Sequence, residues 1–161
     1  IAYGEAIAIL AGDGLLTQAF ATLVELGPSA GAAVACLAER AGARELLGGQ
    51  AIDLTTKPSS LAAIERLHAA KTGALFAASA ELGAIAAGAD ATRCRALRDY
   101  GMAIGIAFQH ADDRDDGEML EHAAAAADRI RILGDEARAI ASALPAGERL
   151  VAIADWFASR A

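Results

Sequence analysis

Apolar residues recur every three or four positions along most of the chain, which is the spacing of one face of an α-helix. Over residues 118–144 this spacing is regular, and the charged residues fall on the opposite face. The first 26 residues carry only three charged side chains, so a helix there would be apolar nearly all round. A helix of that kind is buried on several sides or lies at an interface. With little β-branched alternation, the pattern predicts an all-α fold.

Turn and capping residues divide the chain into predicted helices. Gly27, Pro28 and Ser29 end the first one, and Ser29 can cap the next. A loop over residues 55–60 precedes a further helix that begins after Ser60, and Asp90 can cap the one that follows. The other predicted helices cover residues 30–41, 44–54, 91–111 and 148–160. Neither a repeat nor a linker interrupts them, so we predict a single helical domain over residues 1–161.

Composition narrows the class of protein. The chain has 161 residues, of which 55% are apolar and only 4% aromatic, and alanine supplies much of the apolar share. Its length suits one substantial core, and alanine favours closely packed helices. The net charge of −7 argues against a nucleic-acid partner, because such a partner requires a basic surface. A small anionic substrate would therefore need a local cation or a metal ion.

Cysteine use and the N-terminal stretch indicate the compartment. Cys36 and Cys94 lie in separate apolar segments without the spacing of metal ligands, so we expect free, buried thiols in a reducing cytosol. The N-terminal stretch lacks the features of a signal peptide, and charges, alanine and glycine interrupt the longest apolar runs. We therefore expect a cytoplasmic location and no stable insertion into a membrane.

Candidate chemistry is concentrated where one of these helices ends in aspartates. Asp112 and Asp116 are four residues apart, so they share a helix face with Gln109 one turn earlier. Carboxylates at a helix C-terminus are disfavoured by the helix dipole and repel each other. A bound Mg2+ would relieve both effects. The alternative is a solvated acidic helix end followed by a turn at Gly117.

Lysine is rare, with two residues against twelve arginines. Lys71 is the only charged residue between His68 and Glu81. Such a lysine either extends its ammonium to solvent along an apolar surface or binds an anion such as a diphosphate. Gly73 beside Thr72 would permit a kink that frees backbone carbonyls.

Two further patterns have alternative explanations. Gln50 and Asp53 lie three residues apart, which gives either a polar ligand-binding face or merely an exposed one. Gly101 and Gly105 share a stripe with Gln109, and they either leave a groove for a ligand chain or let two helices pack closely.

Together these segments resemble the trans-isoprenyl diphosphate synthases, also called the polyprenyl synthetase family. The resemblance covers most of the chain in motif order. Its motifs are Gly4-Glu5-Ala6-x-Ala8-Ile9-Leu10-Ala11-Gly12-Asp13, Gly49-Gln50-x-x-Asp53, His68-x-x-Lys71-Thr72-Gly73-Ala74-Leu75 and Phe108-Gln109-x-x-Asp112-Asp113-x-x-Asp116. The last is similar to the second aspartate-rich motif of that family.

The resemblance implies an isoprenoid-synthase-type helical bundle and a prenyltransferase. Its reaction joins an allylic diphosphate to isopentenyl diphosphate and gives short-chain products of the geranyl, farnesyl or geranylgeranyl type. It further implies that the helix containing Gly4 and Asp13, which resembles the family's helix after its first aspartate-rich motif, helps to form a homodimer. The implied roles are Mg2+ binding for Asp112, Asp113 and Asp116, diphosphate binding for Lys71, Gln50 and Asp53, and catalysis for Lys71, Thr72 and Gln109.

Two features of the family are missing from the sequence. Its first aspartate-rich motif and the following arginine would precede Ile1, so we expect a bundle without its N-terminal helices and no chain elongation by residues 1–161 alone. The lysine-bearing loop after the second motif is absent, although Arg114 or Arg129 could supply a cation. This absence leaves a second hypothesis open, namely a non-catalytic subunit or dimerisation module of the same fold.

Overall fold

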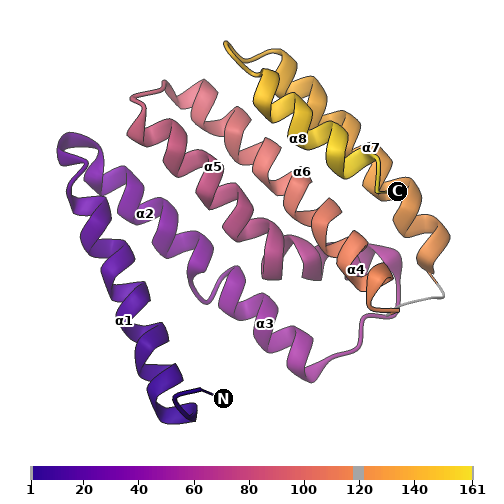
Figure 1. Ribbon diagram of the computed structural model, residues 1–161, viewed down its shortest axis with the longest axis horizontal. Coiled ribbons are helices and arrows are strands. Elements are labelled where there is room, and N and C mark those ends of the chain that lie inside the picture. The colour runs from indigo at the N-terminus through magenta and orange to yellow at the C-terminus, as the bar shows by residue number, and fades with distance from the viewer. Residues whose placement is uncertain (1, 118–121, 161) are drawn as a thin grey trace.

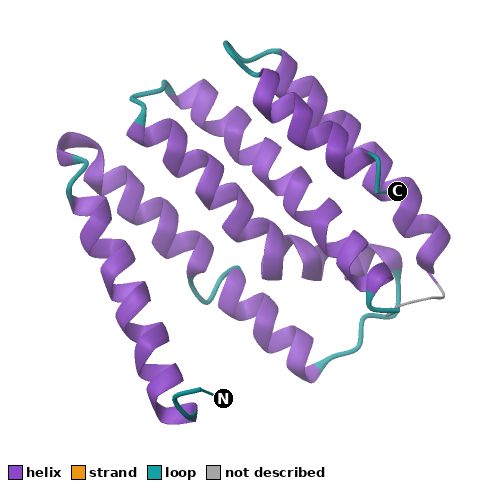
Figure 2. Ribbon diagram, in the orientation of Figure 1, coloured by secondary structure: helices purple, strands orange, loops and turns teal. Residues whose placement is uncertain are grey.

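The computed structural model describes residues 2–117 and 122–160. These residues form helices joined by short turns and contain no strand (Figure 2), which confirms the predicted all-α fold. The helices are α1 (Glu5–Val24), the 3-10 turn η1 (Gly27–Ser29), α2 (Ala30–Ala41), α3 (Leu46–Thr55), α4 (Leu61–His68), the π-helical turn η2 (Ala69–Gly73), α5 (Ala74–Ala86), α6 (Ala91–Asp115), α7 (Ala123–Ser142) and α8 (Glu148–Ala158).

Successive long helices lie side by side in the bundle (Figure 1). α1 packs on α2, α2 on α5, α5 on α6 and α6 on α7, while α8 folds back against α7. α3 contacts η2, and α4 contacts both η2 and α6. The short helix α4 therefore packs on α6 directly, and α3 packs on η2, which itself contacts α6.

Glycines bring α6 very close to the rod formed by η2 and α5. A Cβ atom on Gly101 would lie 2.5 Å from the carbonyl oxygen of Phe76, and one on Gly105 would lie 2.7 Å from the Cα atom of Gly73. Both distances are too short for any side chain. Of the two explanations for this glycine stripe, the structure supports close helix packing rather than a groove.

The main core lies between α6, α7 and α8 and depends on small side chains. Five of its buried members are alanines, which let the helix axes approach closely. The phenol of Tyr100 donates a hydrogen bond of 2.8 Å to the carbonyl oxygen of Leu150 and so ties α6 to α8. The buried members are Tyr100, Ala103, Ile104, Ala107, Leu133, Ala137, Ala141, Ala154 and Phe157.

Helix α1 differs from the rest of the bundle because none of its residues is buried. The predicted helix is present, and of its two predicted environments the chain does not show burial on several sides, so a place at an interface stays a prediction. Its large apolar residues are exposed: Ile7, Ile9, Leu10, Leu15, Leu16 and Val24. By length and composition alone α1 passes the test for a membrane-spanning helix, with 20 residues and a hydropathy of 1.6. An exposed apolar surface of this kind usually marks a site where another surface binds.

Candidate functional site

The site is built on a π-helical turn within one continuous helical rod. α4 is capped by Ser60, whose hydroxyl accepts a hydrogen bond from the backbone N–H of Ala63. After His68 the rod widens into η2, which contains Lys71 and Thr72, and α5 follows directly. Single π turns of this kind alter the direction of side chains and carbonyls, and they occur often at functional sites. The turn ends at Gly73, beside which the sequence predicts a kink.

Helix α3 packs directly against the π turn. A Cβ atom on Gly49 would lie 2.6 Å from the backbone nitrogen of Lys71 and 2.9 Å from the Cβ atom of Ala70, so only glycine fits there. This close contact places Asp53 opposite Lys71, and the ammonium donates to Asp53 Oδ2 at 2.6 Å. Each of the two side chains is about a third exposed, at 29% and 31%, so water screens the pair.

A chain of hydrogen bonds crosses from the π turn to the acidic end of α6. Thr72 Oγ1 donates to Gln109 Oε1 at 2.7 Å, and Gln109 Nε2 donates to Asp113 Oδ1 at 2.8 Å. The other oxygen of that carboxylate, Asp113 Oδ2, lies 3.0 Å from His68 Nε2. The fold thus joins Thr72 and Gln109, which are 37 residues apart in the sequence.

The carboxylate of Asp113 is turned inward, and its side chain is only 12% exposed. Burial alone would raise its pKa, but the hydrogen bonds from His68 and Gln109 outweigh burial and leave the pKa below its ordinary value. Asp113 is therefore ionised at neutral pH, and each of its oxygens already accepts a hydrogen bond from the protein.

Asp112 and Asp116 point in another direction. Both side chains are exposed and line a small polar cavity of about 200 Å3. In the described part of the chain, neither carboxylate has a hydrogen bond or an ion pair with another side chain. The cavity is lined by Asp53, Leu67, His68, Lys71, Gln109, Asp112, Asp113 and Asp116. All the predicted site residues except Gln50 and Thr72 line this cavity.

These residues fit Mg2+ of the kind that is bound mainly through water and substrate. Within residues 2–117 and 122–160, no group of three His, Cys, Asp or Glu side chains is arranged to hold a metal ion. Asp113 is committed to His68 and Gln109, which leaves Asp112 and Asp116. Mg2+ commonly takes one or two carboxylates and completes its octahedron with water and phosphate oxygens, so these two suffice. A bound Mg2+ would also offset the unfavourable interaction of these carboxylates with the C-terminal end of the helix.

Gln50, like Thr72, is a predicted site residue that does not line the cavity. Its side chain is exposed on α3, three residues before Asp53. Its role in binding a diphosphate stays a prediction.

Sequence reasoning missed a buried polar cluster behind the cavity. His68 and His110 are each 2% exposed, and their rings meet edge to face with centroids 4.5 Å apart. Glu65 lies 3.6 Å from His110 Nε2 and accepts a hydrogen bond of 2.5 Å from Arg129 Nε, which ties α4 to α7. Arg129 therefore does not supply a cation to the cavity. The available signal was two histidines on otherwise apolar helix faces.

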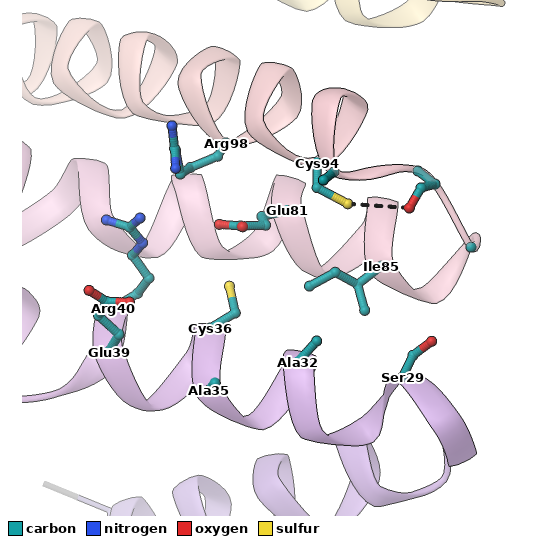
Figure 3. Close-up of a pocket in the computed structure, with 13 residues that line it drawn as sticks. Ser29, Ala32, Ala35, Cys36, Glu39, Arg40, Glu81, Ile85, Cys94 and Arg98 are labelled. Carbon is teal, nitrogen blue, oxygen red and sulfur yellow. Dashed lines mark hydrogen bonds between the residues drawn. The ribbon is translucent and has the colours of Figure 1, made fainter.

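A larger cavity of about 580 Å3 lies between α2, α5 and α6 (Figure 3). Both cysteines line it and both are free, as predicted; Cys36 is buried and Cys94 is half-buried. Burial and the adjacent Glu81 raise the pKa of the Cys36 thiol to about 12. This thiol is therefore un-ionised and unreactive at neutral pH.

Comparisons with known proteins agree with this architecture. The family model described as polyprenyl synthetase matches residues 1–122. The farnesyl diphosphate synthase of Geobacillus stearothermophilus is 40% identical over 119 residues, covering 69% of this chain and 40% of that protein. The geranylgeranyl diphosphate synthase of Rhodobacter capsulatus is 42% identical over 123 residues, covering 73% of this chain and 40% of that protein.

Among solved structures, an FPP/GFPP synthase from Zymomonas mobilis superposes with a TM-score of 0.87 and 33% identity. It covers 97% of this chain and 62% of that one. The helical bundle is thus of the isoprenoid-synthase type. The chain belongs to the polyprenyl synthetase family, as its motifs indicated. It spans about two fifths of the length of these curated relatives.

Proposed function

We propose that the full-length protein is a short-chain prenyltransferase that joins an allylic diphosphate to isopentenyl diphosphate. The observation that carries this proposal is the hydrogen bond from Thr72 to Gln109, because Gln109 lines, together with Lys71, a cavity edged by Asp112 and Asp116. One small site thus combines a cation for a diphosphate, carboxylates for Mg2+ and two oxygen atoms beside the leaving group.

The proposed reaction is a substitution at an allylic carbon. The bond between C1 of the allylic chain and its diphosphate oxygen breaks, and the electron pair leaves with the diphosphate. The double bond of isopentenyl diphosphate then supplies two electrons to C1, and loss of one proton restores a double bond. The product is longer by one isoprene unit, and inorganic diphosphate is released.

Five residues in or beside the cavity have a defined part in this reaction. Lys71 would neutralise the charge of the diphosphate, whereas Asp112 and Asp116 would hold Mg2+ on it. When bound, Mg2+ stabilises the negative charge that develops on the leaving oxygen. Thr72 and Gln109 would direct oxygen lone pairs toward the developing allylic cation, a form of preorganised electrostatic stabilisation.

The hydroxyl of Thr72 has the polarity that this role requires. It donates its hydrogen atom to Gln109 Oε1, so only lone pairs of Thr72 Oγ1 remain for other partners. A positive centre in the cavity would meet the negative end of that dipole. This orientation costs nothing at the moment of reaction because the fold has already fixed it.

We also infer that the protein is a homodimer in which α1 is covered by a second copy. Support comes from the exposed apolar residues of α1, such as Ile7, Leu10 and Leu15, because large apolar patches usually mark interfaces. Light scattering on the purified protein in detergent-free buffer should give twice the chain mass. A monomer, or co-sedimentation with vesicles of neutral phospholipid, would contradict this inference.

Product analysis tests the proposed activity. The full-length protein is incubated with dimethylallyl or geranyl diphosphate, radiolabelled isopentenyl diphosphate and Mg2+, and the products are separated by chain length. Elongated products that disappear with EDTA are expected. No product at saturating substrate would instead support the non-catalytic subunit suggested by the absence of lysine after Asp116. The cytoplasmic location stays a prediction.

A further inference from the structure

The buried side of the cavity contains a histidine that has no part in the proposed reaction itself. His68 lies on the last turn of α4, three residues before Lys71, and its side chain is 2% exposed. Its Nε2 atom lies 3.0 Å from Asp113 Oδ2. An ionised carboxylate can only accept hydrogen bonds, so the proton of this bond belongs to His68 Nε2.

The hydrogen bond between His68 and Asp113 leaves the other ring nitrogen of His68 without a partner in the described part of the chain. Nδ1 of His68 is buried without a hydrogen-bond partner among the described residues. A buried polar atom without a partner is destabilising and uncommon in native proteins. A packing role alone would be served better by an apolar side chain, so the bond to Asp113 needs an explanation.

The carboxylate of Asp113 determines the orientation of the Gln109 side-chain amide. Because the carboxylate of Asp113 can only accept, it takes up the NH2 end of the Gln109 side chain through Oδ1. The carbonyl end of the amide must then face Thr72, and it accepts the hydroxyl proton there. Three consecutive hydrogen bonds thus allow a single orientation of donors and acceptors from His68 to Thr72.

Loss of this constraint would reverse the polarity beside the reacting carbon. If the amide of Gln109 rotated by half a turn, its NH2 group would face Thr72 Oγ1, which can accept as well as donate. The hydroxyl proton of Thr72 would then be free to point into the cavity. A cation would face hydrogen atoms instead of lone pairs, which is electrostatically unfavourable.

We propose that His68 is a positioning residue: by anchoring Asp113 it fixes the amide of Gln109 and keeps the lone pairs of Thr72 directed at the site of cation formation. This proposal rests on the proposed prenyltransferase function. It assigns Asp113 to the scaffold of the site, whereas Asp112 and Asp116 face the metal ion. His68 itself touches neither substrate nor metal.

The orientation of Gln109 can be measured without any turnover. In the full-length protein labelled with 15N-glutamine, the side-chain amide of Gln109 is assigned by the loss of its signal in Gln109→Glu. In the wild type, its hydrogen bond to Asp113 should slow exchange with solvent. His68→Phe keeps a flat buried ring but removes the donor, and should speed exchange about tenfold or more, because bonds to charged groups contribute at least that factor.

Two variants serve as controls in the same experiment. His68→Gln carries an N–H group at a similar distance from the backbone and should retain slow exchange. His110→Phe makes the same substitution at the neighbouring buried ring, which gives no hydrogen bond to Asp113, and should also retain it. If His68→Phe does not fold, His68→Leu removes the same donor with a smaller side chain and carries the same expectation.

Kinetics provide the second measurement. His68→Phe should lower kcat about 10- to 100-fold, the usual effect of removing a residue that orients a site, with little change in KM, since Lys71 and the two exposed aspartates remain. His68→Gln should recover most of this loss. Unchanged Gln109 exchange in His68→Phe, or an equal change in His110→Phe, would overturn the proposal whether or not the protein is active. An inactive wild type with the expected exchange pattern would count against the prenyltransferase function only.

Discussion

Lys71 and Asp53 form an ion pair across the interface between the π turn and α3, with Lys71 Nζ 2.6 Å from Asp53 Oδ2. Gly49 makes the pair possible, since any side chain there would collide with the backbone of Lys71. The pair holds the ammonium over the cavity without burying it. Lys71 is therefore directed by a carboxylate, and the alternative in which it simply extends to solvent along an apolar surface does not describe this geometry.

The first prediction concerns the binding of diphosphate by Lys71. Lys71→Met keeps much of the apolar stem but removes the charge, and it leaves Asp53 unpaired beside the other carboxylates. We expect the affinity for inorganic diphosphate with Mg2+ to fall about tenfold or more, because a charged hydrogen bond is lost. Calorimetric titration measures this change.

The control for this prediction is the other lysine of the chain. Lys57 is exposed in the loop between α3 and α4, so Lys57→Met alters the net charge equally but not the cavity. Its affinity should match that of the wild type. Equal affinities in Lys71→Met and the wild type would exclude Lys71 from the diphosphate site.

A second prediction tests the packing of α6 on the rod. Gly105→Ala would place a Cβ atom 2.7 Å from Gly73 Cα and 3.0 Å from Phe76 Cβ, so the helices must separate. We expect the free energy of unfolding to fall by about 1–3 kcal/mol, the usual cost of overpacking. Gly83→Ala in α5 meets no atom within 4 Å, and it should raise this free energy by about 0.5–1 kcal/mol. Urea unfolding followed by circular dichroism distinguishes the two, and similar behaviour of both variants would refute the packing argument.

Much of the fold was predictable because helix periodicity and turn chemistry are local. The predicted bounds of residues 30–41 agree with α2, and Asp90 caps α6 through hydrogen bonds to the backbone N–H groups of Thr92 and Arg93. The last helix turn of α6 extends to Asp115, beyond the predicted end near residue 111. The sequence did not predict this extension because aspartate is a poor helix former and four aspartates lie at this end of the helix.

The site was less predictable where it depends on long-range contacts. Spacing placed Asp112, Asp113 and Asp116 together, but the inward turn of Asp113 is set by His68, 45 residues earlier. The periodicity of α1 likewise could not distinguish burial from exposure, because both need the same apolar residues. Helix glycines were also ambiguous until their neighbours were known.

A third prediction concerns stability at mildly acidic pH. Burial, followed by the neighbouring His68, lowers the pKa of His110 to about 4 from 6.5; Arg129 acts in the same direction, while Glu65 and Asp113 oppose it. Between these two pKa values the unfolded chain binds more protons than the folded one, so stability increases with pH over that range. The contribution is complete above pH 6.5 and is lost as the pH falls toward 4.

The loss should be on the order of 3 kcal/mol, from the difference between the two pKa values. Urea unfolding of the wild type and His110→Phe at several pH values from 4 to 7, with a chelator present, measures it. The wild type should lose more stability than the variant as the pH falls. Parallel curves would show that His110 titrates alike in both states.

The last prediction concerns the two exposed aspartates that face the cavity. Asp112→Asn removes one charge with almost no change in volume. Because Asp112 is exposed and has no side-chain partner in the described residues, the fold should persist. Stability should even rise by about 0.3–1 kcal/mol, since a negative charge leaves a helix C-terminus. Mg2+-dependent turnover, by contrast, should fall by about 100-fold or more, because half of the carboxylate pair is lost.

Asp115→Asn is the matched control: it lies on the same helix turn, pairs with Arg160 and does not line the cavity. Turnover is measured against Mg2+ concentration for both variants, with thermal unfolding in parallel. If Asp112→Asn and Asp115→Asn keep the same turnover at limiting Mg2+, the acidic end of α6 is only a solvated helix terminus.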